Sequence, residues 1–219
     1  MDLEGLHKRV EEGFDIGSFD FVMYLASYGK ITLEMLKFLM EHGASITKTN
    51  HQGFTVPDNM AVYGKNIDYE ILKYLIENGL SLKKNNHCYD TFQGKLATYG
   101  NITHPMLELL VNEPDMDVND QDASGRSFAM KLAINDRITL PVLKTLVENG
   151  LSFDKHDCQN ATFIKLFASY NHVTMEMVEF LLEQGENFDP VYVFVKQEFT
   201  RKDEQNRIEF YNSKINKLD

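Results

Sequence analysis

Three histidines and two cysteines are the residues of this sequence whose chemistry could support metal binding or catalysis. His51, His87 and His156 fall in equivalent turns, and Cys88 and Cys158 lie next to two of them. A structural zinc site needs four convergent ligands, whereas these residues belong to separate segments strung along the chain. A Cys–His nucleophile would need a cleft and an orienting partner. We therefore expect exposed turn residues, with no metal and no catalytic site.

Charge and cysteine content narrow the class of protein further. The 219 residues include 22 Lys and Arg against 33 Asp and Glu, a formal charge of −11. Such an acidic chain repels nucleic acid and anionic membranes, and its apolar segments are too short to span a bilayer. Two cysteines are too few for a disulfide framework, and the acidic N-terminus lacks a secretory signal. We expect a cytoplasmic protein, with a nuclear location or delivery into a host cell left open.

No segment has the pattern of a cofactor or nucleic-acid site. Gly53 and Gly125 are isolated turn glycines and form no phosphate-binding loop. Aromatic and basic residues do not alternate as they do in nucleic-acid-binding surfaces. We expect no cofactor, and a partner that is a protein.

A short phrase of Ile or Val followed by Thr or Asp recurs five times along the chain. Its second residue is Thr32, Asp68, Thr103, Thr139 or Thr174, at spacings of 36, 35, 36 and 35 residues. A fixed period of this length indicates one small unit stacked on copies of itself. Stacked repeats usually form extended binding surfaces.

The phrase opens the second helix of each unit. Apolar residues follow at +3, +4, +7 and +8 in every copy, as in Met35, Leu36, Leu39 and Met40, which places one apolar stripe on a helix. The Thr or Asp is a favourable N-cap. Gly43, Gly79, Gly150 and Gly185 stand where the helix should end in a left-handed residue. In the third unit Pro114 takes the glycine position and predicts a different end.

A shorter apolar helix precedes each phrase. It contains a recurring alanine, which predicts close packing between units: Ala26, Ala61, Ala97, Ala133 and Ala168. Six residues earlier stands a candidate N-cap: Asp20, Thr55, Thr91, Ser127 or Thr162. Each unit therefore reads as turn, short helix, connection, longer helix and loop.

These units resemble ankyrin repeats. Asn50-x-x-Gly53-x-Thr55 and Asp122-x-x-Gly125-x-Ser127 are similar to the family's D-x-x-G-x-T turn, and Leu39-Met40-Glu41-His42-Gly43-Ala44 is similar to its L-L-x-x-G-A segment. The family's T-P-L-H tetrapeptide is absent, because its His position holds Asp58, Gly94, Met130 or Lys165. The units are also longer than the usual 33 residues, as in some viral and microbial ankyrin proteins, with the extra residues between the helices.

The resemblance implies an all-α fold: an ankyrin-repeat solenoid of about five helix–turn–helix units. Residues 1–16 would form an N-terminal half-repeat cap, residues 17–188 the ankyrin-like repeats, and residues 189–219 a C-terminal helical cap and tail. The resemblance further implies a monomer that binds a partner protein along its concave face.

A tyrosine stands two residues after the recurring alanine in four of the five units. In ankyrin proteins this position ends the first helix and faces the concave surface, near the turns. We expect these tyrosines and nearby turn residues to bind the partner: Tyr28, His51, Phe54, Tyr63, His87, Tyr99, Arg126, His156 and Tyr170. The alternative is that the tyrosines pack inward and serve stability.

We therefore expect a non-enzymatic protein-interaction module. One alternative is a viral or microbial effector that occludes an enzyme or targets it for degradation. Another is an enzyme, which a ligand buried among His51, His87 and Cys88 would indicate.

Overall fold

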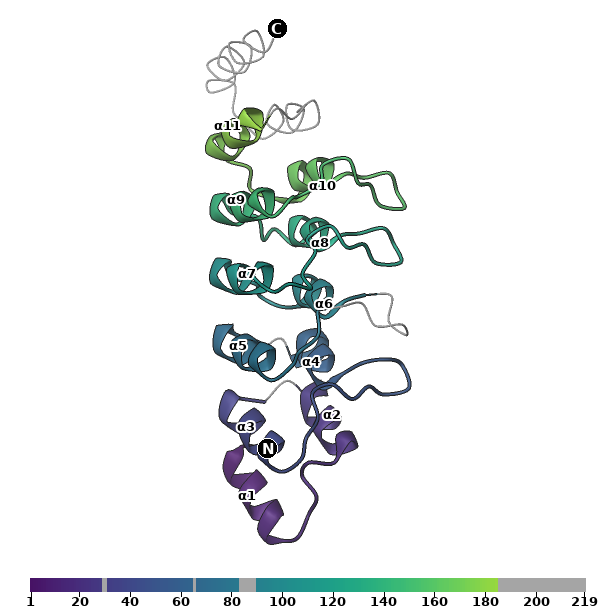
Figure 1. Ribbon diagram of the computed structural model, residues 1–219, viewed down its shortest axis with the longest axis vertical. Helices are drawn as coiled ribbons and strands as arrows, with labels where there is room; N and C mark the ends of the chain where they lie inside the picture. Colours follow the sequence, from purple (N-terminus) through teal and green to yellow (C-terminus); the bar gives the residue numbers. More distant parts are fainter. Residues whose placement is uncertain (29–30, 65, 83–89, 185–219) are drawn as a thin grey trace, which may run out of the picture.

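The helices of the chain stack in two parallel rows. The computed structural model describes residues 1–28, 31–64, 66–82 and 90–184. The first-helix row contains α2 (Phe19–Ser27), α4 (Val56–Asn59) continued by the π-helix η1 (Met60–Gly64), α6 (Phe92–Tyr99), α8 (Phe128–Ile134) and α10 (Phe163–Tyr170) (Figure 1). The second-helix row contains α1 (Leu3–Glu11), α3 (Leu33–Glu41), α5 (Tyr69–Glu77), α7 (His104–Val111), α9 (Leu140–Glu148) and α11 (Met175–Glu183).

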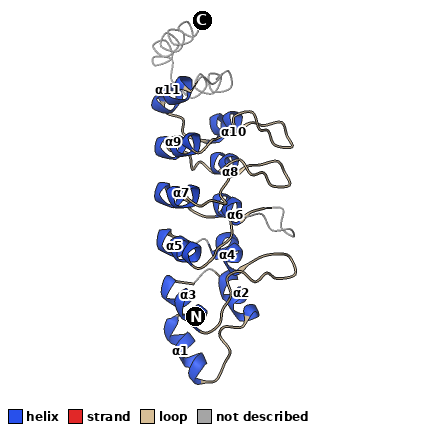
Figure 2. Ribbon diagram, in the orientation of Figure 1, coloured by secondary structure: helices blue, strands red, loops and turns tan. Residues whose placement is uncertain are grey.

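The described part of the chain is helical and has no named strand, so the all-α prediction is confirmed (Figure 2). Two isolated antiparallel bridges, between Gln121 and Ser127 and between His156 and Thr162, close the turns before α8 and α10. None of the described helices has the length and hydrophobicity of a membrane span. The predicted C-terminal cap, residues 189–219, lies outside the described residues.

The second helices begin where the sequence predicts. Thr32, Asp68 and Thr174 are N-caps whose side chains accept a hydrogen bond from the backbone of the first turn. Thr103 and Thr139 are also N-caps, but without that bond, and a proline stands in each of these first turns.

The ends of the second helices also follow the prediction. Gly43, Gly79 and Gly150 adopt φ of 92°, 90° and 77°, a conformation that favours glycine. Gly185 lies outside the described residues. The helix before Pro114 ends at Val111, one position earlier in its unit than the other second helices.

The first helices begin as predicted in four units, where Thr55, Thr91, Ser127 and Thr162 cap them through their side chains. In the first unit the prediction was wrong, because α2 starts at Phe19, its N-cap is Ser18, and Asp20 lies in the first turn. The turn before α2 is shorter than the others, and within it the Gly17 backbone passes close to the His42 carbonyl group.

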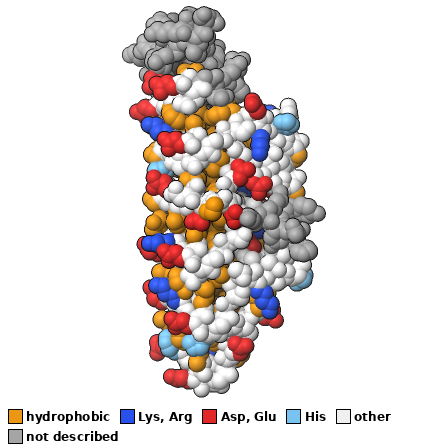
Figure 3. All heavy atoms as spheres, viewed as in Figure 1, with side chains coloured by type: hydrophobic (Ala, Val, Ile, Leu, Met, Phe, Trp, Pro, Cys, Tyr) orange, Lys and Arg blue, Asp and Glu red, His pale blue; other side chains and the backbone are white. Residues whose placement is uncertain are grey.

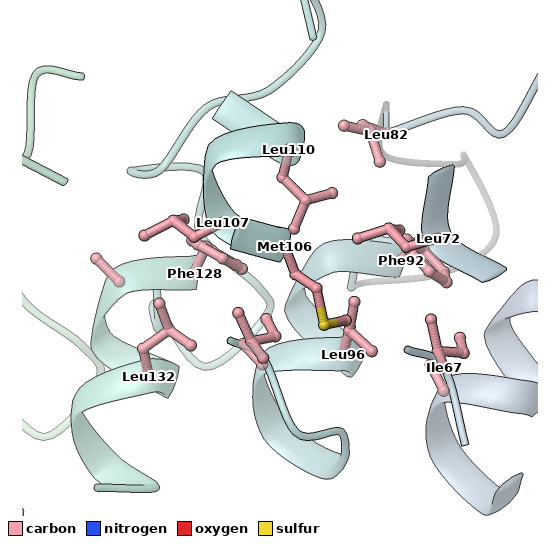
Figure 4. Close-up of a cluster of buried hydrophobic side chains, with 14 of the residues drawn as sticks. Ile67, Leu72, Leu82, Phe92, Leu96, Met106, Leu107, Leu110, Phe128 and Leu132 are labelled. Atoms are coloured by element: carbon pink, nitrogen blue, oxygen red, sulfur yellow. The ribbon is translucent and has the colours of Figure 1, made fainter. Parts of the chain in front are cut away.

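The core runs continuously between the two rows. The five recurring alanines are each no more than 2% exposed. Figure 4 shows Leu72, Phe92, Leu96, Met106, Leu107 and Phe128, from helices of both rows, converging within it. Burying one large apolar side chain contributes about 1.5–3 kcal/mol, so the core shared by successive units stabilises the stack.

Polar side chains link neighbouring units at the first-helix row. Asn59 donates to the Ser27 hydroxyl, at 3.0 Å, in the unit before it. Lys95 lies 2.9 Å from Asp58, and both side chains are buried. Lys131 lies 2.6 Å from Asp90 in the preceding unit and 3.0 Å from Asp122. Asn59, Lys95 and Lys131, which make these contacts, hold equivalent positions in three successive units.

The lengthened connections between the helices form a second set of links. Asn66 donates to the Ile31 carbonyl oxygen at 2.5 Å. Asn171 is 3% exposed. It accepts from the Ile138 N–H at 3.1 Å and donates to the Ala133 carbonyl oxygen. The extra residues therefore join adjacent units through backbone groups.

Candidate binding surface

The four tyrosines of the predicted surface lie exposed at the ends of the first helices. The exposed fractions are 66% for Tyr28, 58% for Tyr63, 47% for Tyr99 and 55% for Tyr170. Each follows the buried alanine by two residues, and in the α-helices that contain Tyr99 and Tyr170 two residues rotate a side chain by about 200°. An inward alanine therefore turns the tyrosine toward solvent. The alternative that these side chains pack inward does not fit this geometry.

The tyrosines occupy equivalent positions in successive units, and we call Tyr28, Tyr63, Tyr99 and Tyr170 the tyrosine row. Asn135 interrupts the row, where it caps the C-terminus of α8 and donates to the Lys131 carbonyl oxygen at 2.8 Å. At the other end the row widens, because Tyr24 is 58% exposed and its ring lies 4.6 Å from that of Tyr28. The sequence analysis did not identify Tyr24, although its position four residues before Tyr28 places both side chains on the same face of a helix.

Two of the predicted turn residues point into contacts between units. Phe54 is half-buried, and the Lys95 ammonium lies 4.8 Å from its ring centroid. Arg126 is half-buried and lies 3.5 Å from the Asp157 carboxylate of the following unit. Both side chains hold neighbouring units together.

The remaining predicted residues lie in the turns. His51 and His156 are exposed, whereas His87 lies outside the described residues. These turns precede the first helices and the tyrosines end them, so a helix such as α6 separates the two groups by about 12 Å. The structure does not bring them together as one strip.

Charge is distributed unevenly over the molecule. Figure 3 shows charged side chains gathered along the edge formed by the second-helix row, with hydrophobic side chains along the middle of that face. Every second helix from α3 to α11 carries glutamate, and the cations of these five helices are Lys37, Lys73 and Lys144. Two of the cations of the first helices, Lys95 and Lys131, are buried in ion pairs. The second helices from α3 to α11 therefore carry a net negative charge.

The second-helix row also has a hollow of about 480 Å³. Tyr69 of α5, Glu108 of α7, and Thr145 and Glu148 of α9 line it. Thr145 is held by His104, whose Nε2 lies 2.9 Å from its hydroxyl oxygen. The hollow depends on three consecutive units, which is why no local motif in the sequence indicated it.

Asp157 stabilises the turn before α10. Its buried carboxylate accepts backbone hydrogen bonds from Gln159 and Ala161, both at 2.9 Å. Burial alone would raise the pKa of Asp157, but these donors, together with Arg126, hold it below the ordinary value of 3.8. Asn50 makes the same pair of bonds, to Gln52 and Phe54, in an earlier unit.

Replacing Asp157 with Asn should flatten the acid dependence of stability. Because the pKa of Asp157 is lower in the folded chain, its ionised form stabilises the fold above pH 3.8, and that contribution is lost as the pH falls through the folded pKa. At neutral pH we expect the variant to lose about 1–2 kcal/mol. Urea unfolding at neutral pH and near pH 3 measures both effects, and an unchanged difference between the two conditions would contradict the assignment.

The structure gives a partial view of the residues first considered for chemistry. Cys158 is exposed and unpaired, whereas Cys88 and His87 lie outside the described residues. Within the described ranges, no group of three or more His, Cys, Asp or Glu side chains is arranged to hold a metal ion.

Comparison with known proteins finds neither a family model nor a curated protein that matches this chain. The functional argument therefore depends on the surface described above.

Proposed function

We propose that this chain is a non-enzymatic interaction module, an ankyrin-like solenoid that binds a protein partner through the tyrosine row. The single observation that carries the proposal is the exposure of Tyr28, Tyr63, Tyr99 and Tyr170 at equivalent positions of stacked units. Tyrosine is enriched at the energetic centres of protein interfaces, because it buries a large area at a small cost in side-chain entropy.

Repetition supports this role. Each tyrosine ends a helix whose opposite face is fixed in the core by a buried alanine. The aromatic rings are therefore held on a rigid scaffold, and a partner that reaches several units gains from each of them. Function in such modules lies in the surface, since the scaffold is shared by proteins with unrelated partners.

The test is a double substitution, Tyr63→Ala with Tyr99→Ala. A partner would first be isolated by affinity capture and purified, and its dissociation constant would then be measured with each variant. We expect affinity to fall at least about tenfold, while the free energy of unfolding changes by about 0.5 kcal/mol or less per exposed site.

The matched control is Tyr69→Ala, which removes a tyrosine that is 38% exposed on the second-helix row. It should leave affinity unchanged. If Tyr69→Ala weakens binding and the double substitution does not, the hollow beside α7 is the binding surface and the proposal is wrong.

A further inference from the structure

The hollow on the second-helix row combines negative charge with a concave shape. Its volume of about 480 Å³ is in the range of ligand-binding pockets. Glu108 and Glu148 line it, and both are exposed, whereas none of the described residues that line it is lysine or arginine. The His104 Nε2 atom lies 3.8 Å from the Glu108 carboxylate, which is too far for a hydrogen bond. Both carboxylates can therefore accept from a ligand.

Two asparagines add further acceptors to the hollow. Asn112 and Asn149 line it, and each donates its side-chain NH₂ group to the carbonyl oxygen four residues earlier, at 2.8 Å in both cases. This use of the NH₂ group leaves the amide oxygen as the acceptor for a ligand. A ligand of the hollow must therefore supply several N–H donors and a positive charge.

A guanidinium group fits this lining better than an ammonium group. It is planar, it carries five N–H donors that can pair with carboxylates, and its face stacks on aromatic rings. Tyr69, which is 38% exposed, supplies such a ring in the hollow. Leu109 and Val111 also line the hollow, and the methylene groups of an arginine side chain would pack against them.

The lysines of the second helices leave this charge largely uncompensated. The Lys37 ammonium lies over an aromatic ring of α5, and the Lys144 ammonium lies over one of α11. Lys73 follows Tyr69 by four residues and shares its face of α5, but it does not line the hollow. Two lining carboxylates therefore face one neighbouring cation.

We propose that this hollow binds an arginine side chain of a peptide segment. The guanidinium pairs with Glu108 and Glu148 and stacks on Tyr69. Free arginine is a poorer ligand, because the same two glutamates repel its α-carboxylate. The inference is independent of the proposed function, since the hollow lies on the second-helix row and the tyrosine row ends the first helices.

An NMR titration of the isotope-labelled intact chain measures such binding and locates it residue by residue. The probe is N-acetyl-arginine N-methylamide, which is blocked at both ends. The corresponding citrulline compound has nearly the same shape without the charge, and free arginine distinguishes a free amino acid from a peptide side chain. We expect the largest chemical-shift changes at the hollow, and probe binding at least about threefold tighter than that of either control.

Matched variants test which residues bind the probe. Glu108→Gln with Glu148→Gln should weaken probe binding about fivefold, and Tyr69→Ala should weaken it about threefold. Glu11→Gln with Glu41→Gln removes the same charge from exposed positions of α1 and α3, and it should change binding less than about twofold because salt screens distant charges. An equal loss in the two double variants would overturn the inference.

Three further measurements complete the test. Lys73→Gln should strengthen probe binding, because it removes a neighbouring cation. Equal binding of the arginine and citrulline compounds would overturn the inference, and tighter binding of free arginine would overturn the assignment to a peptide segment. Tyr63→Ala with Tyr99→Ala should leave probe binding unchanged, so this inference and the proposed function can fail separately.

Discussion

Replacing Lys95 with methionine should lower the free energy of unfolding by about 3–5 kcal/mol. The Lys95 ammonium lies 2.9 Å from the Asp58 carboxylate, and the two side chains are only 4% and 6% exposed. Removing the cation leaves the buried Asp58 carboxylate without a neutralising charge, although the Thr55 N–H and hydroxyl still donate to its other oxygen. Lys95 also donates to the Asp90 carbonyl oxygen at 3.0 Å, so the substitution leaves a second acceptor without this donor.

Urea unfolding followed by circular dichroism measures the loss. Lys165→Met is the matched control, because Lys165 is exposed on α10, and it should change stability by about 0.5 kcal/mol or less. Adding Asp58→Asn to Lys95→Met should recover part of the loss, since the amide removes the stranded charge. A loss of under about 1 kcal/mol for Lys95→Met would show that the pair is accessible to solvent.

Replacing Gly17 with alanine should destabilise the first unit strongly. A Cβ atom at this position would lie 1.9 Å from the His42 carbonyl oxygen and 2.8 Å from its carbon. Both atoms are backbone, so the turn before α2 must move away from the loop after α3. We expect a loss of about 3 kcal/mol, at the upper end of what overpacking costs.

The effect of Gly17→Ala should be local, because units contact only their neighbours. Hydrogen exchange should accelerate in α1, α2 and α3 and remain unchanged in α8 and α10. Gly5→Ala is the control, since a Cβ there meets only side-chain atoms, at 3.1 and 3.2 Å. It should stabilise α1 by about 0.5–1 kcal/mol. Uniformly faster exchange along the chain would contradict the expectation.

Features set by local sequence could be predicted. Both ends of α3 and α5 are of this kind. Their N-caps, Thr32 and Asp68, and the glycines after them belong to the same short stretch of sequence as the helix itself. Asp20 misled the prediction because the first unit departs from the repeat: its shortened turn packs Gly17 against His42, which is distant in sequence, and α2 begins with Ser18 as its N-cap. The ion pair between Lys95 and Asp58 could not be predicted either, because these two residues are 37 positions apart in the sequence.

The candidate surface also combines features that local sequence determines with features that depend on distant residues. The sequence predicted a surface position for the tyrosine row, and its exposure agrees with the helical angle between Ala97 and Tyr99. The inward placement of Phe54 and Arg126 could not, because it depends on Lys95 and Asp157 in the following units. A turn residue can therefore be assigned to a binding surface only after its contacts with the next unit are known.

The links between units differ at every junction, and this fixes the order in which the units can be assembled. Asn59 meets a hydroxyl, Lys95 a carboxylate beside an aromatic ring, and Lys131 two carboxylates. The next residue in the series, Leu166, is apolar and buried. If the third unit were duplicated, the second copy of Lys95 would meet Gly94 where it now faces Asp58, and it would take the place in which Lys131 contacts Asp90. The units are thus not interchangeable, because a unit moved to another place in the stack would meet different side chains at this position.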